Sequence, residues 1–310
     1  MLVNQLVRDR KIAILALQES HLDDGRTESL NRIFGRHMSI LHSPDPANST
    51  GARGVAIVIN KRILKDCAPT VRQIVPGRAI LITIPWSEDR KLKILNVYAP
   101  NDAAENESFW ARLASERLGR VDLLLGDFNV VEDRADRIPQ REDPEGPREA
   151  LQNLYEGLSM VDGWRNSNPL HPRFTFLQES TSSQSRLDRI YVRRQMLKDC
   201  SDWDITELGI PTDHLLASVA IQNYKAPFVG KGRWVMPVHL LEDQEMKKTM
   251  LALAADLVRQ LDGARARTME VNPQTIYTAF KKELTAAARA RAREKVPKMQ
   301  KRIDRMRDDL

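Results

Sequence analysis

The 310-residue chain has little cysteine, few aromatic residues and no long hydrophobic run. Its two cysteines, Cys67 and Cys200, lie far apart without CxxC spacing, which favours two reduced thiols over a disulfide framework. No window approaches the ~18 continuous apolar residues of a membrane span. Charged residues interrupt the first eleven positions, where a secretory signal needs an apolar stretch. We therefore expect an intracellular protein with no membrane partner.

The net charge of +6 is unevenly distributed along the chain. Residues 223–310 hold 19 Lys and Arg against 11 Asp and Glu, whereas residues 1–222 hold 29 against 31. An acid-rich main part is what a metal site formed by carboxylates would need. We predict a folded domain over residues 1–222, then a linker and a basic helical extension over residues 223–310. The basic run is an ordinary solvated helix face or a nucleic-acid contact, and the sequence leaves both open.

The hydrophobic pattern predicts a mixture of strands and helices. Strands are expected at residues 12–17, 55–60, 79–85, 92–97, 121–125, 174–176, 186–192 and 215–221. Helices are expected at residues 1–10, 28–34, 107–118, 148–156, 240–261 and 273–293, and Pro297 is expected to break or restart the last helix, which ends at Leu310. Because several predicted strands follow one another without a helix between them, the pattern favours a mixed-sheet α/β sandwich over a repeating βαβ barrel.

The most informative stretch is VDLLLGDFN at residues 121–129. Its apolar run reads as a buried strand, and Gly126 is expected to let the chain turn as the strand ends. Asp127 and Asn129 are two positions apart, so in an extended chain both side chains would point to the same side. An isolated D-x-N is more often a polar turn than a site, so the rest of the chain has to supply partners.

Polar side chains of the kinds used in catalysis also lie at the ends of other predicted strands. Pro100 stops the strand before it and fixes where Tyr98 points. The candidate residues are Glu19, Tyr98, Asp127, Asn129, Asp188, Asp213 and His214. The polar loop at residues 131–147 is expected on the surface, and its arginines are either phosphate contacts or plain solvated side chains.

Five short motifs carrying these residues resemble the endonuclease/exonuclease/phosphatase superfamily. They are LQES at Glu19, NVYAPN at Tyr98, GDFN at Asp127, RLD at Asp188 and TDH at His214. They appear in the family's order over about residues 11–222. YAPN, GDFN and LQESHL look most like the apurinic-type endonuclease of non-LTR (LINE-like) retrotransposons. The segment beginning GKGRW resembles the spacer that precedes the reverse transcriptase of such elements.

The resemblance implies a four-layer sandwich of two mixed β-sheets flanked by helices, and a phosphodiesterase that uses Mg²⁺, with Mn²⁺ as a substitute. Glu19 and Asp213 would be metal ligands, and a hard carboxylate suits Mg²⁺. Asp127 would orient or deprotonate the attacking water, and Asn129 would donate to a phosphate oxygen. His214, oriented by Asp188, would contact the phosphate, and Tyr98 would hydrogen-bond the phosphate or assist the leaving group. The implied partner is DNA in the nucleus, with RNA or a reverse transcriptase as further partners.

The sequence departs from the family pattern at its beginning. The family starts with a strand bearing an Asn that contributes to the site, whereas this chain opens on a predicted helix in which Asn4 is no substitute. We therefore expect a sheet that lacks its first strand, with exposed backbone groups on the neighbouring strands. A truncated retrotransposon copy or a mis-started gene would explain it, and such a chain is expected to be unstable or poorly active.

Three functions remain open from the sequence. The first is a Mg²⁺-dependent DNA endonuclease of retrotransposon origin. The second is a cellular abasic-site repair nuclease, which the spacer and basic helices disfavour. The third is a catalytically impaired relic that only binds nucleic acid, which the intact site motifs disfavour. Target-site preference depends on surface loops and cannot be read from the sequence.

Overall fold

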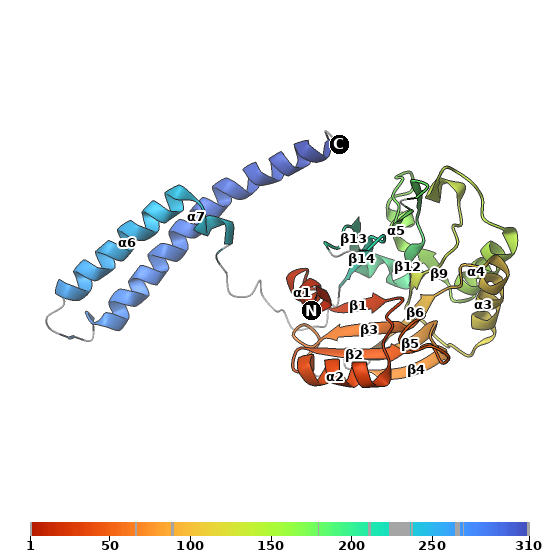
Figure 1. Cartoon of the computed structure of the whole chain (residues 1–310). Coiled ribbons are helices and arrows are strands. Elements are labelled where there is room, and N and C mark those ends of the chain that lie inside the picture. Colours follow the sequence, from red (N-terminus) through yellow and green to blue (C-terminus); the bar gives the residue numbers. More distant parts are fainter. Residues whose placement is uncertain are drawn as a thin grey trace. The chain divides into compact units, whose positions relative to one another are not determined.

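The structure is a computed structural model that describes residues 2–65, 67–87, 90–178, 180–209, 212–222, 236, 238–263, 267–268 and 270–308, with side chains up to residue 295 apart from residues 87, 238 and 239. It divides into two compact units, Met1–Ala226 and Pro227–Leu310 (Figure 1). The predicted linker with its GKGRW segment lies outside the described residues. The assignment of residues 1–222 as a single nuclease domain stays a prediction.

The first unit contains most of the secondary structure. In chain order its elements are α1 (Leu2–Asp9), β1 (Ile14–Leu17), α2 (Asp24–Phe34), β2 (Met38–Ser43), β3 (Val55–Asn60), β4 (Thr70–Val75), β5 (Ala79–Ser87), β6 (Arg90–Tyr98), α3 (Ala103–Ser115), β7 (Leu123–Asp127), η1 (Arg134–Asp136), β8 (Arg137–Ile138), α4 (Glu145–Gly157), β9 (Met160–Asp162), α5 (Gly163–Ser167), β10 (Phe176–Gln178), β11 (Ser183–Ser185), β12 (Asp188–Arg193), η2 (Arg194–Asp199), β13 (Cys200–Thr206) and β14 (Leu216–Ile221).

A six-stranded mixed sheet forms the centre of this unit, in the order β4-β5-β6-β7-β12-β9. Strands β6 and β7 run parallel, and the other neighbouring strands of this sheet pair antiparallel. Strand β7 lies between β6 and β12, and its residues are buried or nearly so. A strand in that position is covered on both faces, which explains why its sequence is apolar without alternation. The predicted buried strand is therefore confirmed.

A second layer of strands packs on one face of the six-stranded sheet. It consists of an antiparallel sheet in the order β1-β3-β2 and an antiparallel pair, β13-β14. Apolar side chains from both layers, such as Ile57, Ile82 and Ile94, form the core between them. Among the described strands, β1 pairs only with β3 and β14 only with β13, so this layer is in two pieces.

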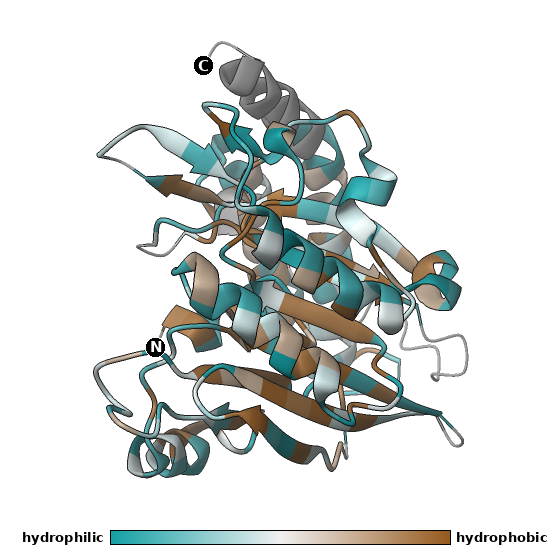
Figure 2. Ribbon diagram, turned by 90° about the vertical axis from the view of Figure 1, so that its right-hand side faces the viewer, coloured by the Kyte–Doolittle hydropathy of each residue, from teal (hydrophilic) through white to brown (hydrophobic). Residues whose placement is uncertain are grey.

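Helices cover the two outer faces and complete the sandwich. Helices α3 and α4 lie over the other face of the six-stranded sheet, and Trp110 and Leu151 belong to the core there. Helices α1 and α2 supply Leu6, Val7 and Leu30 to the core on the outside of the β1-β3-β2 sheet. Figure 2 shows hydrophobic colour concentrated on the strands and hydrophilic colour spread over the helices in front of them. The predicted α/β sandwich with helical outer layers is confirmed.

The second unit is helical in its described part. It contains η3 (Val238–Leu241), α6 (Gln244–Gly263) and α7 (Pro273–Asp308). Leu240, Met246 and Ala288 are buried between them, and Asp243 forms ion pairs with Arg291 and Lys295. Among the described residues, no helix is both long and apolar enough to cross a bilayer.

One expectation for this unit is wrong. Helix α7 is continuous through residue 297, although a proline was expected to break it there. A proline removes only one intrahelical hydrogen bond, and a long helix can continue past that loss with a kink.

Candidate active site

Three of the predicted site residues lie side by side on neighbouring strands of the central sheet. Tyr98, the last residue of β6, pairs with Asp127, the last residue of β7. Asp127 in turn pairs with Asp188, the first residue of β12. Directly opposite residues on adjacent strands are about 5 Å apart and project to the same face. The register therefore brings three residues that are distant in the sequence into one row at the sheet edge.

Gly126 allows β6 and β7 to lie close together next to this row, a role that was not predicted from the sequence. It lies within the paired strand β7 at φ +137°, a backbone conformation that L side chains rarely adopt. A Cβ atom there would lie 2.0 Å from the carbonyl oxygen of Val97 on the neighbouring strand. The expectation of a turn at the strand end is thus wrong. Glycine is required because the backbones of β6 and β7 approach closely just before Asp127.

Asp127 and Asn129 are adjacent in space, but not because the chain is extended. Asn129 has a left-handed φ of 49°, so the backbone turns sharply after Phe128. The Asn129 backbone N–H donates to Asp127 Oδ1 at 3.0 Å, and its side-chain Nδ2 donates to Asp127 Oδ2 at 3.1 Å. Nδ2 also donates to the carbonyl oxygen of Ala99 at 2.9 Å. Both amide hydrogens are engaged with protein acceptors, so in this structure Asn129 orients the Asp127 carboxylate.

Glu19 reaches the row from the other strand layer. It follows the end of β1 with a left-handed φ of 47°, and the Tyr98 hydroxyl donates a hydrogen bond to its Oε1. Just before them, Gln18 Nε2 donates to Asn96 Oδ1 at 2.7 Å, and Asn96 Nδ2 donates to the carbonyl oxygens of Leu17 and Ala56. Asn96 is fully buried between the layers. This polar bridge holds the two strand ends together next to the site.

His214 is held against the other end of the row. Its Nδ1 lies 2.8 Å from Asp188 Oδ2, and its ring lies 4.9 Å from the Phe176 ring, centroid to centroid. The buried Thr175 hydroxyl accepts the backbone N–H groups of Leu187 and Asp188, both at 2.9 Å. The predicted contact between His214 and Asp188 is therefore present, and Thr175 fixes the backbone that delivers Asp188.

The charged residues in and next to the row shift one another's pKa values. Burial, and then the negative charge of Asp188, raise the pKa of Asp127 to about 7, although His214 acts in the opposite direction. Burial alone would lower the pKa of His214, but its hydrogen bond with Asp188 and the charges of Asp188 and Asp127 outweigh this and raise it to about 9. Burial and the bond to Glu19 raise the pKa of Tyr98, which stays a protonated donor.

The donor set at the site suits a hard divalent cation. Asp127 experiences the negative charges of both Asp188 and Glu19, a repulsion that a bound cation would relieve. Among the described residues, no three His, Cys, Asp or Glu side chains gather into a metal cage. Mg²⁺ does not need such a cage, because it keeps several water ligands and uses one or two carboxylates. Glu19 fits this role, whereas the Asp213 side chain is exposed.

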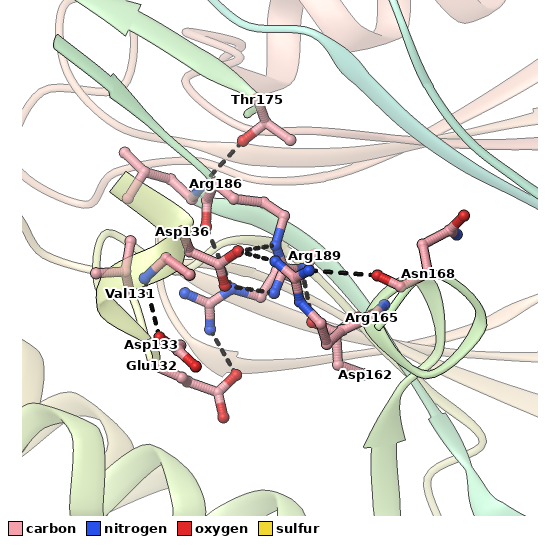
Figure 3. A network of polar contacts seen from close by, with 12 residues as sticks. Val131, Glu132, Asp133, Asp136, Asp162, Arg165, Asn168, Thr175, Arg186 and Arg189 are labelled. Carbon is pink, nitrogen blue, oxygen red and sulfur yellow. Dashed lines mark hydrogen bonds and ion pairs between the residues drawn. The ribbon is translucent and has the colours of Figure 1, made fainter. Parts of the chain in front are cut away.

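The loop after Asn129 was expected to be too polar to pack, and this is wrong for its central part. Asp136 is buried, because Arg186 bonds both of its carboxylate oxygens, Nε to Oδ1 at 2.9 Å and Nη2 to Oδ2 at 2.7 Å (Figure 3). Arg165 also pairs with Asp136, and Arg186 reaches Asp162 Oδ2 at 2.6 Å. Paired charges can be buried where single charges cannot.

The loop arginines considered as phosphate contacts divide into two kinds. Arg137 is half-buried and donates to Asp143 Oδ2 at 2.7 Å, so it is a structural residue of the loop. Arg134 and Arg141 are exposed. A role in phosphate binding stays open for these two residues only.

A sequence profile described as the Endonuclease/Exonuclease/phosphatase family matches residues 2–214, more than half of the chain. The chain belongs to this family. Membership places it among enzymes that hydrolyse phosphoester bonds, as the motifs predicted.

One curated relative is an uncharacterized 149 kDa protein of transposon TX1 from Xenopus laevis, 31% identical over 185 residues. That match covers 57% of this chain and 14% of the transposon protein, so the chain spans a small part of this relative. The retrotransposon-like character predicted from the motifs is consistent with this similarity.

Solved structures of the same fold include two nucleases. An AP endonuclease from Archaeoglobus fulgidus matches with a TM-score of 0.56 and 21% identity, covering 71% of this chain and 92% of the other. The endonuclease domain of TRAS1, a telomere-specific non-LTR retrotransposon, matches with a TM-score of 0.53 and 18% identity, covering 71% and 90%. At these identities the likeness concerns the fold, and it confirms the predicted resemblance of architecture.

Several residues that support the family site were not predicted from the sequence. Asn96, Asn106 and Thr175 are buried polar residues whose hydrogen bonds fix the backbone around the row. Asn106 Nδ2, for example, donates to the carbonyl oxygen of Phe128 at 3.0 Å, next to Asn129. The available signal was a polar residue within an otherwise apolar face, such as Asn106 beside Phe109 and Trp110.

Proposed function

We propose that this member of the Endonuclease/Exonuclease/phosphatase family is a Mg²⁺-dependent DNA endonuclease that nicks target DNA for a non-LTR retrotransposon. The observation that carries the proposal is the row of Tyr98, Asp127 and Asp188, closed by Glu19 at one end and His214 at the other. Acids, a protonated hydroxyl and a histidine therefore meet at one edge of the sheet. The transposon relative and the TRAS1 domain support the biological context.

Phosphodiester hydrolysis requires a polarised phosphate, an activated water and a stabilised leaving oxygen. Glu19 would hold the Mg²⁺, with Asp213 as a second candidate ligand. When bound, the ion would polarise the phosphate and neutralise charge that develops on its oxygens. The remaining requirements fall to the chain's own side chains.

Asp127 is the proposed general base. Its pKa of about 7 is close to neutral pH, which allows the carboxylate to accept a proton from water while a useful fraction is ionised. Asn129 holds this carboxylate by two hydrogen bonds, one from the backbone and one from the side chain. We therefore assign Asn129 to orienting Asp127. Donation to a phosphate oxygen would require one of its two side-chain bonds to open.

His214 and Tyr98 are the proposed contacts to the phosphate. With a pKa of about 9, His214 is largely protonated at neutral pH and supplies a positive charge, while Asp188 binds its Nδ1 and leaves Nε2 available. Tyr98 stays protonated and is a hydroxyl donor that now points to Glu19. Both groups would stabilise the charge that develops on the phosphate as the bond breaks.

The test is nicking of supercoiled plasmid by the full 310-residue chain. We expect nicking with Mg²⁺ or Mn²⁺ and none with EDTA. Asp127→Asn and His214→Ala should each slow it at least ~100-fold, as expected when a general base or a charge-stabilising group is lost. Unchanged nicking by both variants would show that the activity belongs to another site or to a contaminant.

A second substrate distinguishes retrotransposon nicking from abasic-site repair. We expect an oligonucleotide duplex with one abasic site to be cut no more than ~10-fold faster than its undamaged counterpart, a difference of about 1.4 kcal/mol. A preference of several thousandfold for the abasic duplex would favour a repair nuclease instead. DNA binding without cleavage of either substrate would favour a relic.

A further inference from the structure

A buried arginine lies directly behind the proposed site. Arg189 follows Asp188 in β12, so the two side chains project to opposite faces of the central sheet. Asp188 faces the site, whereas Arg189 points toward the layer that holds α3 and α4. The Arg189 side chain is 0% exposed. A charge placed so deeply costs several kcal/mol unless its donors are satisfied.

Several contacts of Arg189 are with the loop that begins after Asn129. Its Nη1 donates to Glu132 Oε1 at 2.9 Å, as Figure 3 shows, and its Nη2 donates to the carbonyl oxygen of Val130. Nη1 also reaches the Tyr191 hydroxyl at 2.9 Å, and Nε donates to the carbonyl oxygen of Arg186 at 3.3 Å. The guanidinium thus occupies nearly all of its hydrogen-bonding capacity with fixed protein groups.

Arg189 also packs against the residue before Asn129. Its guanidinium carbon lies 5.4 Å from the centroid of the Phe128 ring. Phe128 is fully buried and stacks on Trp110. Phe128 and Val130 are the two neighbours of Asn129, and Arg189 contacts both. Arg189 therefore contacts the residues on both sides of Asn129, where the backbone has its left-handed conformation.

We propose that Arg189 is a positioning residue that fixes Asn129, and through it the Asp127 carboxylate, from the far face of the sheet. This inference rests on the proposed function of Asp127 and Asn129. A left-handed asparagine is held only when its surroundings determine the conformation. The carbonyl of Val130 and the ring of Phe128 supply that constraint from either side. Without the guanidinium, the carbonyl of Val130 loses its donor and the backbone after Asn129 is no longer held. The two hydrogen bonds from Asn129 to Asp127 then weaken.

The chain offers a matched control on the same strand. Arg193 lies four residues further along β12, on the same face, and its Nε donates to the carbonyl oxygen of Val121 at 3.2 Å. Val121 precedes β7, whereas Val130 follows it. Both arginines therefore tie a segment next to β7 to β12. Of these two arginines, Arg189 ties the segment that carries Asn129 and Arg193 does not.

The experiment measures single-turnover nicking by the full chain at saturating DNA, together with the Kd for the same DNA with Ca²⁺ in place of Mg²⁺. The double variant Arg189→Met with Glu132→Gln removes the charge pair without leaving the half-buried Glu132 carboxylate unpaired. It should nick at least ~10-fold more slowly, because misplaced reacting groups lower the rate rather than the affinity. Its Kd should stay within ~3-fold of the wild-type value, and Arg193→Met should keep both quantities within ~3-fold.

A double-mutant cycle shows whether Arg189 acts through Asn129. Asn129→Ala should slow nicking strongly, and adding the Arg189 and Glu132 substitutions to it should cost less than ~3-fold more, because the second change removes support for a group that is already absent. If the losses multiply, or if the Arg189→Met, Glu132→Gln variant nicks at the wild-type rate, the inference is overturned.

If the Arg189→Met, Glu132→Gln variant fails to fold, Arg189→Lys tests the same point. Lysine keeps the positive charge but lacks the forked guanidinium that binds Glu132 and Val130 together.

The two proposals fail in different ways. If wild type and Asn129→Ala nick equally well, or neither nicks, the proposed function of the site is wrong. If Asn129→Ala is slow while the Arg189 variants are fast, the site stands and only the positioning role of Arg189 falls.

Discussion

Asp127 shows how much of the proposed chemistry depends on single contacts. Its carboxylate is almost fully buried at the end of β7 and is held by the backbone and side-chain amides of Asn129. Its pKa is raised by burial and by Asp188, so the same environment that orients the carboxylate also makes it a base near neutral pH. Changes in neighbouring residues should therefore alter ionisation as well as geometry.

Asp188→Asn is expected to lower the pKa of His214 from about 9 toward the usual value near 6.5. The substitution removes the negative charge of Asp188 and leaves only a neutral acceptor for the His214 N–H, so the two effects that oppose burial are weakened. The His214 ring protons, followed by NMR as a function of pH in EDTA, would report the change. A His214 pKa that stays near 9 in the variant would contradict the assigned cause.

Gly126→Ala is expected to destabilise the first unit severely, by more than ~3 kcal/mol, because a methyl group would overlap the backbone of β6 at an unfavourable φ. Urea unfolding followed by circular dichroism measures the loss. Gly157→Ala is the control: its Cβ would meet nothing within 4 Å, and it lies in helix α4, so stability should stay level or rise by up to ~1 kcal/mol. Equal effects of the two substitutions would refute the close-approach explanation.

At the scale of elements, strands with strong apolar runs and their terminal residues could be predicted from the sequence. The predicted strand at residues 55–60 coincides with β3, and the site motifs fall at the ends of β1, β6, β7 and β12. The exposed edge strand β4 was missed, because most of it faces solvent without an apolar pattern. The burial of Asp136 was also missed. Its partners Arg186 and Arg165 are 50 and 29 residues away, and charge pairing over such distances leaves no local signal.

The buried charges around Asp136 predict a specific dependence of stability on pH. Burial alone would raise the pKa of Asp136, but its bonds and attraction to Arg186 outweigh this and hold it below the usual value. The stabilisation is therefore fully present above the unfolded-state pKa near 3.9, and it is lost as the pH falls through the lower folded-state value.

Asp136→Asn should cost about 3 kcal/mol at pH 7, because it leaves buried arginines without their charge partner. The difference from wild type should shrink below about pH 4, where the Asp136 carboxyl of the unfolded wild-type chain takes up a proton while that of the folded chain is still ionised. Urea unfolding between pH 3 and 7 tests this. Glu28→Gln, at a carboxylate whose side chain is 75% exposed, is the control and should change stability by less than ~1 kcal/mol. A constant difference between wild type and Asp136→Asn at all pH values would argue against the ion pair.

At the scale of the whole molecule, all seven proposed site residues lie in the first unit, Met1–Ala226, which has its own cores. The second unit carries the excess of positive charge in the sequence. Its exposed basic residues on α7 include Lys281, Lys282 and Arg293. We therefore propose that the first unit carries out catalysis and that the second supplies electrostatic attraction to the DNA backbone.

Removing residues 227–310 is expected to leave the single-turnover nicking rate at saturating DNA within ~3-fold of the full chain, because every proposed site residue is retained. The affinity for DNA should fall at low salt, and the slope of log K against log [salt] should become shallower by about 0.9 for each phosphate that the second unit neutralises. Fluorescence anisotropy at several salt concentrations measures this. An unchanged slope would mean that the basic helices are a solvated surface. A loss of nicking by a folded fragment would mean that the site extends into the second unit.

The most direct test of the central claim follows the attacking oxygen. A DNA duplex is cleaved to completion by the full chain in H₂¹⁸O with Mg²⁺, and the masses of the products are measured by mass spectrometry. Hydrolysis by a water that Asp127 activates predicts one ¹⁸O atom in the phosphate at the new end and none in the 3′-hydroxyl fragment, with no product from Asp127→Asn in the same time. Cleavage products whose phosphate carries no ¹⁸O, or equal cleavage by Asp127→Asn, would contradict water attack at this site.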